Sequence, residues 1–146
     1  MPLVDHVAIC PADLAESLRF YRDGLGLEVL FDVTFDADLE PLLGVATERV
    51  RTVFLGDPQQ PDAGRLELLE IGGSGRLAPG SPAAGVPHRG ACLISFVLPV
   101  EETLSRLADL DLGGVARRMP GAGGPSAVVV DPDGVLVEIL SRVPSL

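Results

Sequence analysis

Near its end the chain reads Asp131-Pro132-Asp133-Gly134-Val135-Leu136-Val137-Glu138-Ile139-Leu140, a tight turn followed directly by an apolar strand that carries one carboxylate. An earlier stretch has the same order, with Asp57-Pro58, a loop, and then Arg65-Leu66-Glu67-Leu68-Leu69-Glu70. A carboxylate inside a buried strand is costly unless something positive satisfies it. Because the same costly feature occurs twice, the sequence predicts a duplicated module and a shared site.

The order of the expected elements around these two strands also repeats. Hydrophobic periodicity and turn residues predict strand–helix–strand–strand–strand in each half of the chain. In the first half we expect a strand at 3–10, a helix from Asp13 that ends at Gly24 and Gly26, strands at 28–35, 48–55 and 66–71, and a helical insertion at 38–43. In the second half we expect a strand at 92–99, a helix at 101–110, strands at 115–119, 127–130 and 135–140, and a turn at 120–125.

Length and composition fit one domain of 146 residues with enough apolar material for a core. We expect module one at 1–71, a Gly/Pro-rich linker at 72–90 and module two at 91–146. The net charge of -10 argues against nucleic acid and against anionic membrane surfaces as partners. Without an apolar leader or a membrane-length run, the sequence predicts a cytoplasmic protein. Cys10 and Cys92 are expected to be buried, reduced thiols.

Three side chains that can bind a metal stand on otherwise apolar strand faces. Strand alternation puts His6, Glu67 and Glu138 each on a face with aliphatic neighbours. If the strands of both halves curve around one cavity, one imidazole nitrogen and two carboxylates can converge there. Such an oxygen-rich set suits a divalent ion with open positions for a substrate, such as Mn, Fe, Co, Ni, Zn or Mg.

The repeated order and several short motifs resemble the vicinal-oxygen-chelate superfamily, which includes glyoxalase I, methylmalonyl-CoA epimerase, extradiol dioxygenases and bleomycin- and fosfomycin-resistance proteins. The motifs are Asp5-His6-Val7-Ala8, Leu18-Arg19-Phe20-Tyr21 with Leu25-Gly26-Leu27, and the run from Asp131 to Glu138. The resemblance implies an α+β fold of two tandem βαβββ modules that form a curved mixed sheet around a central cavity, with the helices outside. It also implies a homodimer, whose site lies within one chain or is built from both.

In the metal-dependent members of that superfamily, four equivalent positions supply the ligands, and here they are His6, Glu67, Leu93 and Glu138. Leu93 departs from the pattern, because the third position usually holds histidine. The resemblance implies a metal-dependent isomerase, epimerase or lyase that abstracts a proton next to a carbonyl of a small substrate, with Glu138 or Glu67 as base. A metal-free protein that sequesters a drug or metabolite is the alternative favoured by Leu93, and an iron-dependent dioxygenase is the third. Arg51 is a candidate for binding a substrate carboxylate, and Leu93 for lining the substrate site.

Other readings of the same residues stay open. Glu70 replaces Glu67 if the strand register is shifted by one residue. Glu138 can pair with Arg117 or Arg51 and hold no metal. His88 in the linker can also reach the site.

Overall fold

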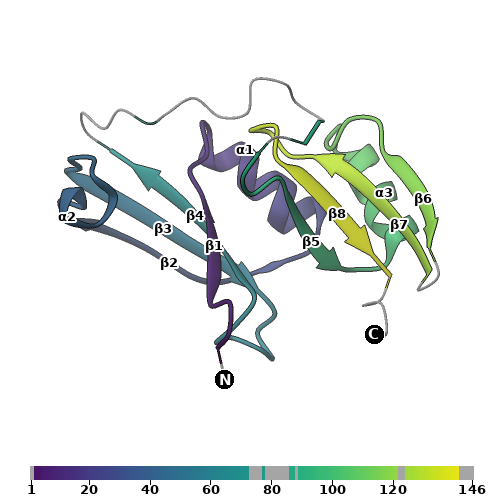
Figure 1. Cartoon of the computed structure of the whole chain (residues 1–146), viewed down its shortest axis with the longest axis horizontal. Coiled ribbons are helices and arrows are strands. Elements are labelled where there is room, and N and C mark those ends of the chain that lie inside the picture. Colours follow the sequence, from purple (N-terminus) through teal and green to yellow (C-terminus); the bar gives the residue numbers. More distant parts are fainter. Residues whose placement is uncertain (1, 73–76, 78–85, 88, 122–123, 142–146) are drawn as a thin grey trace. The chain divides into compact units, whose positions relative to one another are not determined.

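The computed structural model describes residues 2–72, 77, 86–87, 89–121 and 124–141. Its contacts divide the chain into two compact units. Unit 1 comprises residues 1–14 and 27–79, and unit 2 comprises residues 15–26 and 80–146. Each unit contains one four-stranded sheet (Figure 1). Most of the 72–90 segment, including His88, lies outside the described residues.

Unit 1 holds a mixed sheet with the strand order β1-β4-β3-β2. Strand β1 (His6–Ile9) is parallel to β4 (Arg65–Ile71), and β3 (Arg49–Gly56) runs antiparallel to both β4 and β2 (Glu28–Asp36). The short helix α2 (Glu40–Leu43) lies between β2 and β3. It ends at Gly44, whose φ of 72° is a left-handed conformation that glycine adopts without steric cost.

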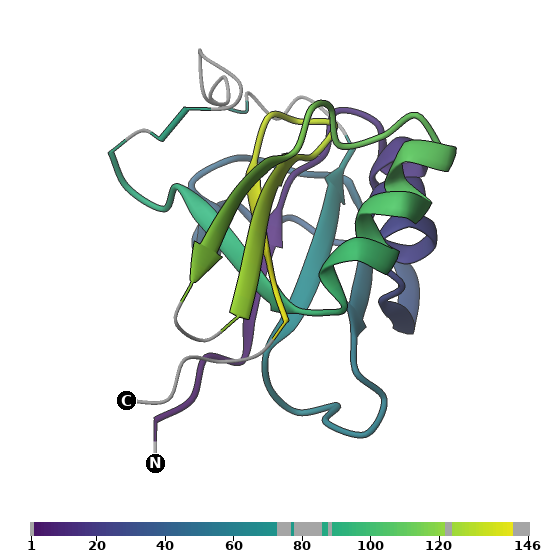
Figure 2. The ribbon, with the colours of Figure 1, turned by 90° about the vertical axis from the view of Figure 1, so that its right-hand side faces the viewer.

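Unit 2 repeats this topology with β5 (Leu93–Val97), β6 (Arg117–Gly121), β7 (Gly124–Val130) and β8 (Leu136–Leu140) in the order β5-β8-β7-β6. Helix α3 (Val100–Asp109) follows β5 and packs along the sheet (Figure 2). On one face of the sheet Val129, Val137 and Ile139 are almost fully buried. On that face Leu107 of α3 and Val129 of β7 approach the same glycine, Gly113. The apolar stripe of α3 therefore builds the core of this unit.

Strand register confirms the internal repeat. In both units the first strand lies parallel to the fourth, and a one-residue slip would have moved every side chain to the other face. The register is also the same in both units, so that residues 6–9 correspond to residues 93–96. In unit 1, His6 and Ala8 of β1 are paired with Arg65 and Glu67 of β4. In unit 2, Leu93 and Ser95 of β5 are paired in the same way with Leu136 and Glu138 of β8. The α+β class and the two tandem βαβββ modules are thus confirmed.

The segment after Asp13 is helical as predicted, but it is not one regular helix. It begins as α1 (Leu14–Leu18) and continues as a π-helix, η1 (Arg19–Gly24), in which the Leu25 N–H donates to the Phe20 carbonyl at 2.9 Å. Residues 15–26 belong to unit 2, where η1 lies beside α3 (Figure 2). The contact units therefore differ in this segment from the expected modules 1–71 and 91–146, whose boundaries stay a prediction.

The expectation that Cys10 and Cys92 are buried was wrong, and the strands around the turn predicted at 120–125 are longer than expected. Strand β6 continues to Gly121 and β7 begins at Gly124, with Pro120 opposite Pro125 in the hairpin. The prolines are tolerated there because Pro120 lies on the edge strand β6, and Pro125 precedes Ser126, where the pairing of β7 with β8 begins. Cys10 is exposed and Cys92 is half-buried, because Cys10 follows the end of the short strand β1.

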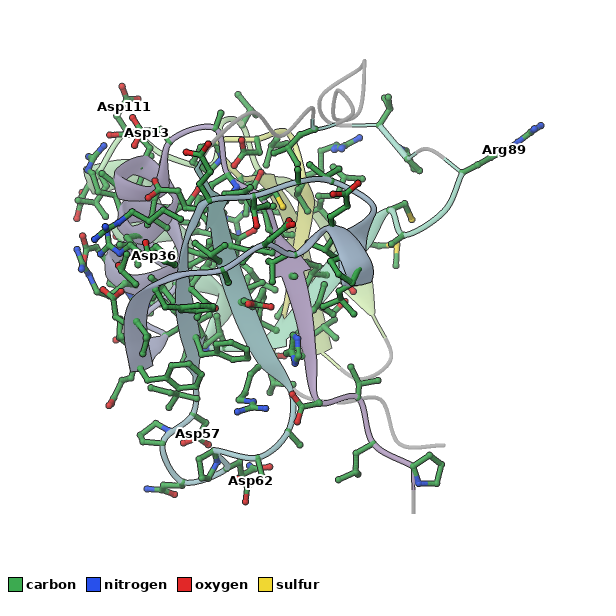
Figure 3. All side chains as sticks on the ribbon, turned by 90° about the vertical axis from the view of Figure 1, so that its left-hand side faces the viewer. Asp13, Asp36, Asp57, Asp62, Arg89 and Asp111 are labelled. Atoms are coloured by element: carbon green, nitrogen blue, oxygen red, sulfur yellow. The ribbon has the colours of Figure 1, made fainter. Side chains whose placement is uncertain are left out.

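The acidic surplus is found largely at the surface of the described residues. Figure 3 shows Asp57 and Asp62 on the loop between β3 and β4, with their side chains directed away from the sheet. Asp36 at the end of β2 is likewise exposed. Among the described residues, we find no helix with the length and apolar character needed to cross a membrane.

Candidate active site

In unit 1, His6 and Glu67 lie on the same face of the sheet and contact each other. The Nε2 atom of His6 is 3.3 Å from Oε2 of Glu67, whose side chain is only 14% exposed. The other oxygen of Glu67 accepts a hydrogen bond from the Thr52 hydroxyl at 2.6 Å. This contact settles the register in favour of Glu67, since Glu70 is three positions further along β4 and lies on the opposite face, where it is exposed.

A second set of contacts surrounds the His6 ring. Its Nδ1 atom is 2.5 Å from Oδ1 of Asp5, and Arg65 donates a further hydrogen bond to the same oxygen. These hydrogen bonds, first from His6 and then from Arg65, lower the pKa of Asp5. The rings of His6 and Phe54 meet edge to face at 4.9 Å. The Arg65 guanidinium lies over the same Phe54 ring, 4.8 Å from its centre.

In unit 2, Glu138 occupies the position that corresponds to Glu67. The Ser95 hydroxyl, on the neighbouring strand, donates to Oε2 of Glu138 at 2.5 Å. Glu138 and Leu93 both line a cavity of about 310 Å³. The cavity is lined by Pro87, Leu93, Arg117, Arg118, Met119, Ser126, Ala127, Val128, Leu136 and Glu138. A carboxylate thus faces a concave, mainly apolar surface, which is typical of a site for a small organic molecule.

The donors present fit part of a metal site. Two ligands of one divalent ion, bound about 2.1 Å from it, lie about 3 Å apart, so His6 Nε2 and Glu67 Oε2 at 3.3 Å suit one ion. In unit 2, the position equivalent to His6 is Leu93, whose side chain has no atom that can bind a metal. Glu138 is the metal ligand that the family resemblance assigns to this unit. Neither unit, in its described part, brings together three or more His, Cys, Asp or Glu side chains arranged to hold a metal ion.

Arg51 lies apart from the His6–Glu67 pair within unit 1. It neighbours Thr52 on β3 and therefore points to the opposite face of the sheet. There it donates two hydrogen bonds to Asp32, at 3.0 and 2.8 Å, and lines a second cavity with Glu70. The assignment of Arg51 to substrate binding stays a prediction, as does that of Leu93. Arg117 lines the same cavity as Glu138.

One buried polar pair in unit 2 was not predicted from the sequence. The Tyr21 hydroxyl donates to Oδ2 of Asp131 at 2.7 Å, and backbone N–H groups of Asp133 and Val135 donate to its other oxygen. Burial raises the pKa of Tyr21, and it also raises the pKa of Asp131 despite these hydrogen bonds. The sequence did contain a signal for such a pair. The helical segment carries the single tyrosine of the chain, and a tyrosine hydroxyl that is buried needs a hydrogen-bond partner. The pair connects η1 to the turn before β8.

Three comparisons relate the chain to known proteins. A family model described as the Glyoxalase/Bleomycin resistance protein/Dioxygenase superfamily matches residues 3–139. The lactoylglutathione lyase-like protein terB of Aspergillus terreus is 32% identical over 149 residues, which cover 95% of this chain and 75% of that protein. The trypanothione-dependent glyoxalase I of Leishmania major is 25% identical, with 96% of this chain and 86% of that one covered and a TM-score of 0.60.

A glyoxalase family protein from Bacillus cereus shares the fold at 15% identity, with 95% of this chain and 93% of that one covered and a TM-score of 0.68. The family match extends over nearly the whole chain and therefore includes both units and all four of the positions compared above. The chain belongs to the glyoxalase/bleomycin resistance protein/dioxygenase superfamily.

Proposed function

We propose that this protein is a glyoxalase-type isomerase or lyase that moves a proton on a carbon next to a carbonyl group of a small substrate. The observation that carries the proposal is the pair of equivalent strand carboxylates, Glu67 and Glu138, each held by one hydroxyl group on a neighbouring strand. A carboxylate positioned in this way can accept a proton from carbon. The 32% identical relative named as lactoylglutathione lyase-like supports the reaction class.

In this proposal His6, Glu67 and Glu138 would hold a divalent metal, which when bound would supply Lewis-acid polarisation of a substrate carbonyl. Glu138 is the base. The Ser95 hydroxyl donates to its Oε2, so Oε1 remains to take the proton. The apolar side chains of Leu93 and Val128 line the cavity beside it.

A second candidate function is metal-free binding of a small organic ligand. Leu93 favours it, because an aliphatic side chain replaces a donor at the cavity wall and extends the apolar surface. In this case Glu138 would accept hydrogen bonds from the ligand rather than a proton from carbon. The two functions differ in whether purified protein carries metal and whether it turns over a carbonyl substrate.

The test is elemental analysis of protein purified without chelators, combined with an assay for lactoylglutathione formation from methylglyoxal and glutathione. The proposal expects about one divalent ion per chain, and its loss in Glu67→Ala and in Glu138→Ala. Glu70→Ala is the matched control, because it removes an exposed carboxylate from the other face of the same strand as Glu67. Leu93→His should raise metal affinity by supplying the fourth donor.

Absence of metal in wild type, even after dialysis against Mn, Fe(II), Co, Ni and Zn salts, would refute the metal-dependent enzyme. Saturable binding of an apolar carboxylic acid by that metal-free protein, lost in Glu138→Ala, would then support the binding function. Metal retained equally in Glu138→Ala would instead exclude Glu138 as a ligand.

A further inference from the structure

We propose that Asp5 is a positioning residue that fixes the tautomer and the direction of His6. Arg65 holds Asp5 in place, Asp5 takes the Nδ1–H of His6, and the lone pair on Nε2 is thereby directed at Glu67. The inference rests on the proposed function in one respect, because it makes His6 a ready donor for the divalent ion. The state of the imidazole can nevertheless be measured in protein that carries no metal.

The contacts around Asp5 form a chain of fixed groups. His6 and Arg65 are register partners on the parallel strands β1 and β4, and both reach the same Oδ1 atom of Asp5. The side chain of Arg65 is only 18% exposed and lies over the ring of Phe54. Packing of this kind leaves the guanidinium few alternative positions, so Asp5 is held although it is itself exposed.

The hydrogen bonding of Arg65 at this site is directed to Asp5. Its Nη2 atom donates to Oδ1 of Asp5, whereas its Nε–H is buried and, among the described residues, is the side-chain polar atom without a hydrogen-bond partner. The contact with Asp5 and the packing on Phe54 therefore determine where the guanidinium lies.

The two nitrogens of His6 differ in how closely they meet a carboxylate. A neutral imidazole has one N–H donor and one lone pair. The contact from Nδ1 to Asp5 is 2.5 Å and that from Nε2 to Glu67 is 3.3 Å, so the proton belongs on Nδ1. Nε2 then presents its lone pair to a carboxylate oxygen, an arrangement that a cation between them stabilises.

Glu67 is oriented in a complementary way. Its Oε1 is occupied by the Thr52 hydroxyl, which turns Oε2 towards His6. The orientations of His6 Nε2 and Glu67 Oε2 are therefore each fixed by a hydrogen bond from outside the pair. In metal sites of other proteins, a carboxylate bonded to the second nitrogen of a histidine ligand has the same effect. Removing such an outer partner typically lowers metal affinity about 10- to 100-fold.

The first measurement is the tautomer of His6 in metal-free protein, from two-bond ¹H–¹⁵N correlations, which distinguish the Nδ1–H, Nε2–H and doubly protonated forms. The chain has two histidines, so the substitution His88→Gln leaves the spectrum of His6 alone. We expect the Nδ1–H tautomer in this background. Asp5→Ala should shift His6 to the Nε2–H tautomer that free histidine prefers, whereas Asp5→Asn, whose carbonyl can still accept from Nδ1–H, should retain most of the Nδ1–H form.

The second measurement is the affinity for Co²⁺ by calorimetry, for which we expect a loss of about 10- to 100-fold in Asp5→Ala. Asp32→Ala is the matched control, because Asp32 is also an exposed aspartate paired with an arginine, on the other face of the sheet. It should change neither the tautomer nor the affinity.

An Nε2–H tautomer in the His88→Gln background, or one unchanged by Asp5→Ala, would overturn the inference. If that background shows the Nδ1–H tautomer and loses it in Asp5→Ala but binds no Co²⁺, the positioning role stands and the metal-dependent function fails. The two proposals therefore fail by different results.

Discussion

Replacing Tyr21 with phenylalanine removes one hydroxyl group from the buried helical segment and leaves the ring in place. Tyr21 is 0% exposed and Asp131 is 4% exposed, so water cannot replace the lost hydrogen bond of 2.7 Å. Asp131 keeps two backbone N–H donors on its other oxygen. A hydrogen bond to a charged group contributes about 1.5–3 kcal/mol. We therefore expect Tyr21→Phe to lower the free energy of unfolding by about that amount at pH 7.

The pH dependence of this loss follows from Asp131. Burial raises the pKa of Asp131 above its ordinary 3.8, and the Tyr21 hydroxyl opposes that rise. For an acid with a raised folded-state pKa, stability falls as pH rises through that pKa, because the unfolded state releases the proton first. Tyr21→Phe raises the pKa of Asp131 further. The difference in the free energy of unfolding between wild type and variant is thus largest at neutral pH and becomes smaller as the pH falls towards 4.

Urea unfolding followed by circular dichroism at pH 7 and at pH 4 measures this effect. Asp131→Asn and the double variant complete a double-mutant cycle, which isolates the energy of the Tyr21–Asp131 contact. A loss below about 0.5 kcal/mol at pH 7, the usual range of surface substitutions, would refute the reasoning. An equal loss at both pH values would also refute it, since the charge of Asp131 would then have no part in the contact.

Three further predictions concern local packing and hydrogen bonds, each read from the unfolding free energy. Gly24→Ala should cost about 1–3 kcal/mol, because its Cβ would lie 2.5 Å from Cδ2 of the buried Leu107; an unchanged midpoint would show that the leucine moves freely. Gly44→Ala should cost about 1–2 kcal/mol through its φ of 72° alone, since no atom lies within 4 Å of the new methyl group, and a stabilised variant would contradict this. Thr52→Val should cost about 1.5–3 kcal/mol by removing the 2.6 Å hydrogen bond to Glu67, whereas Thr52→Ser should restore most of it.

The sequence was sufficient for the strand positions that carry the site. Alternation along a strand is a local property, so the apolar neighbours of Glu67 and Glu138 predicted which face each carboxylate occupies. The internal repeat is also visible in the register, which places Ala8 beside Glu67 and Ser95 beside Glu138. Where the local pattern was weak, as for the proline-containing β6–β7 hairpin, the predicted strands ended too early before the turn and began too late after it.

The sequence did not predict the hydrogen-bond and ion-pair partners of polar side chains. Arg51 was a candidate for a substrate carboxylate, yet in the structure its guanidinium binds Asp32 on the opposite face from Thr52. Tyr21 and Asp131 are 110 positions apart, and their contact depends on where η1 packs in unit 2. Asp5 was part of a family motif, but its hydrogen bond with His6 became visible only from side-chain positions.

By itself, the sequence determined the duplicated topology, the family and the strand faces of His6, Glu67 and Glu138, because periodicity and short motifs are set by neighbouring residues. The tertiary structure decided which groups hold these side chains: Thr52 for Glu67 and Ser95 for Glu138. These pairings join different strands, and a hydrogen bond requires a distance and a direction that no spacing along one strand specifies.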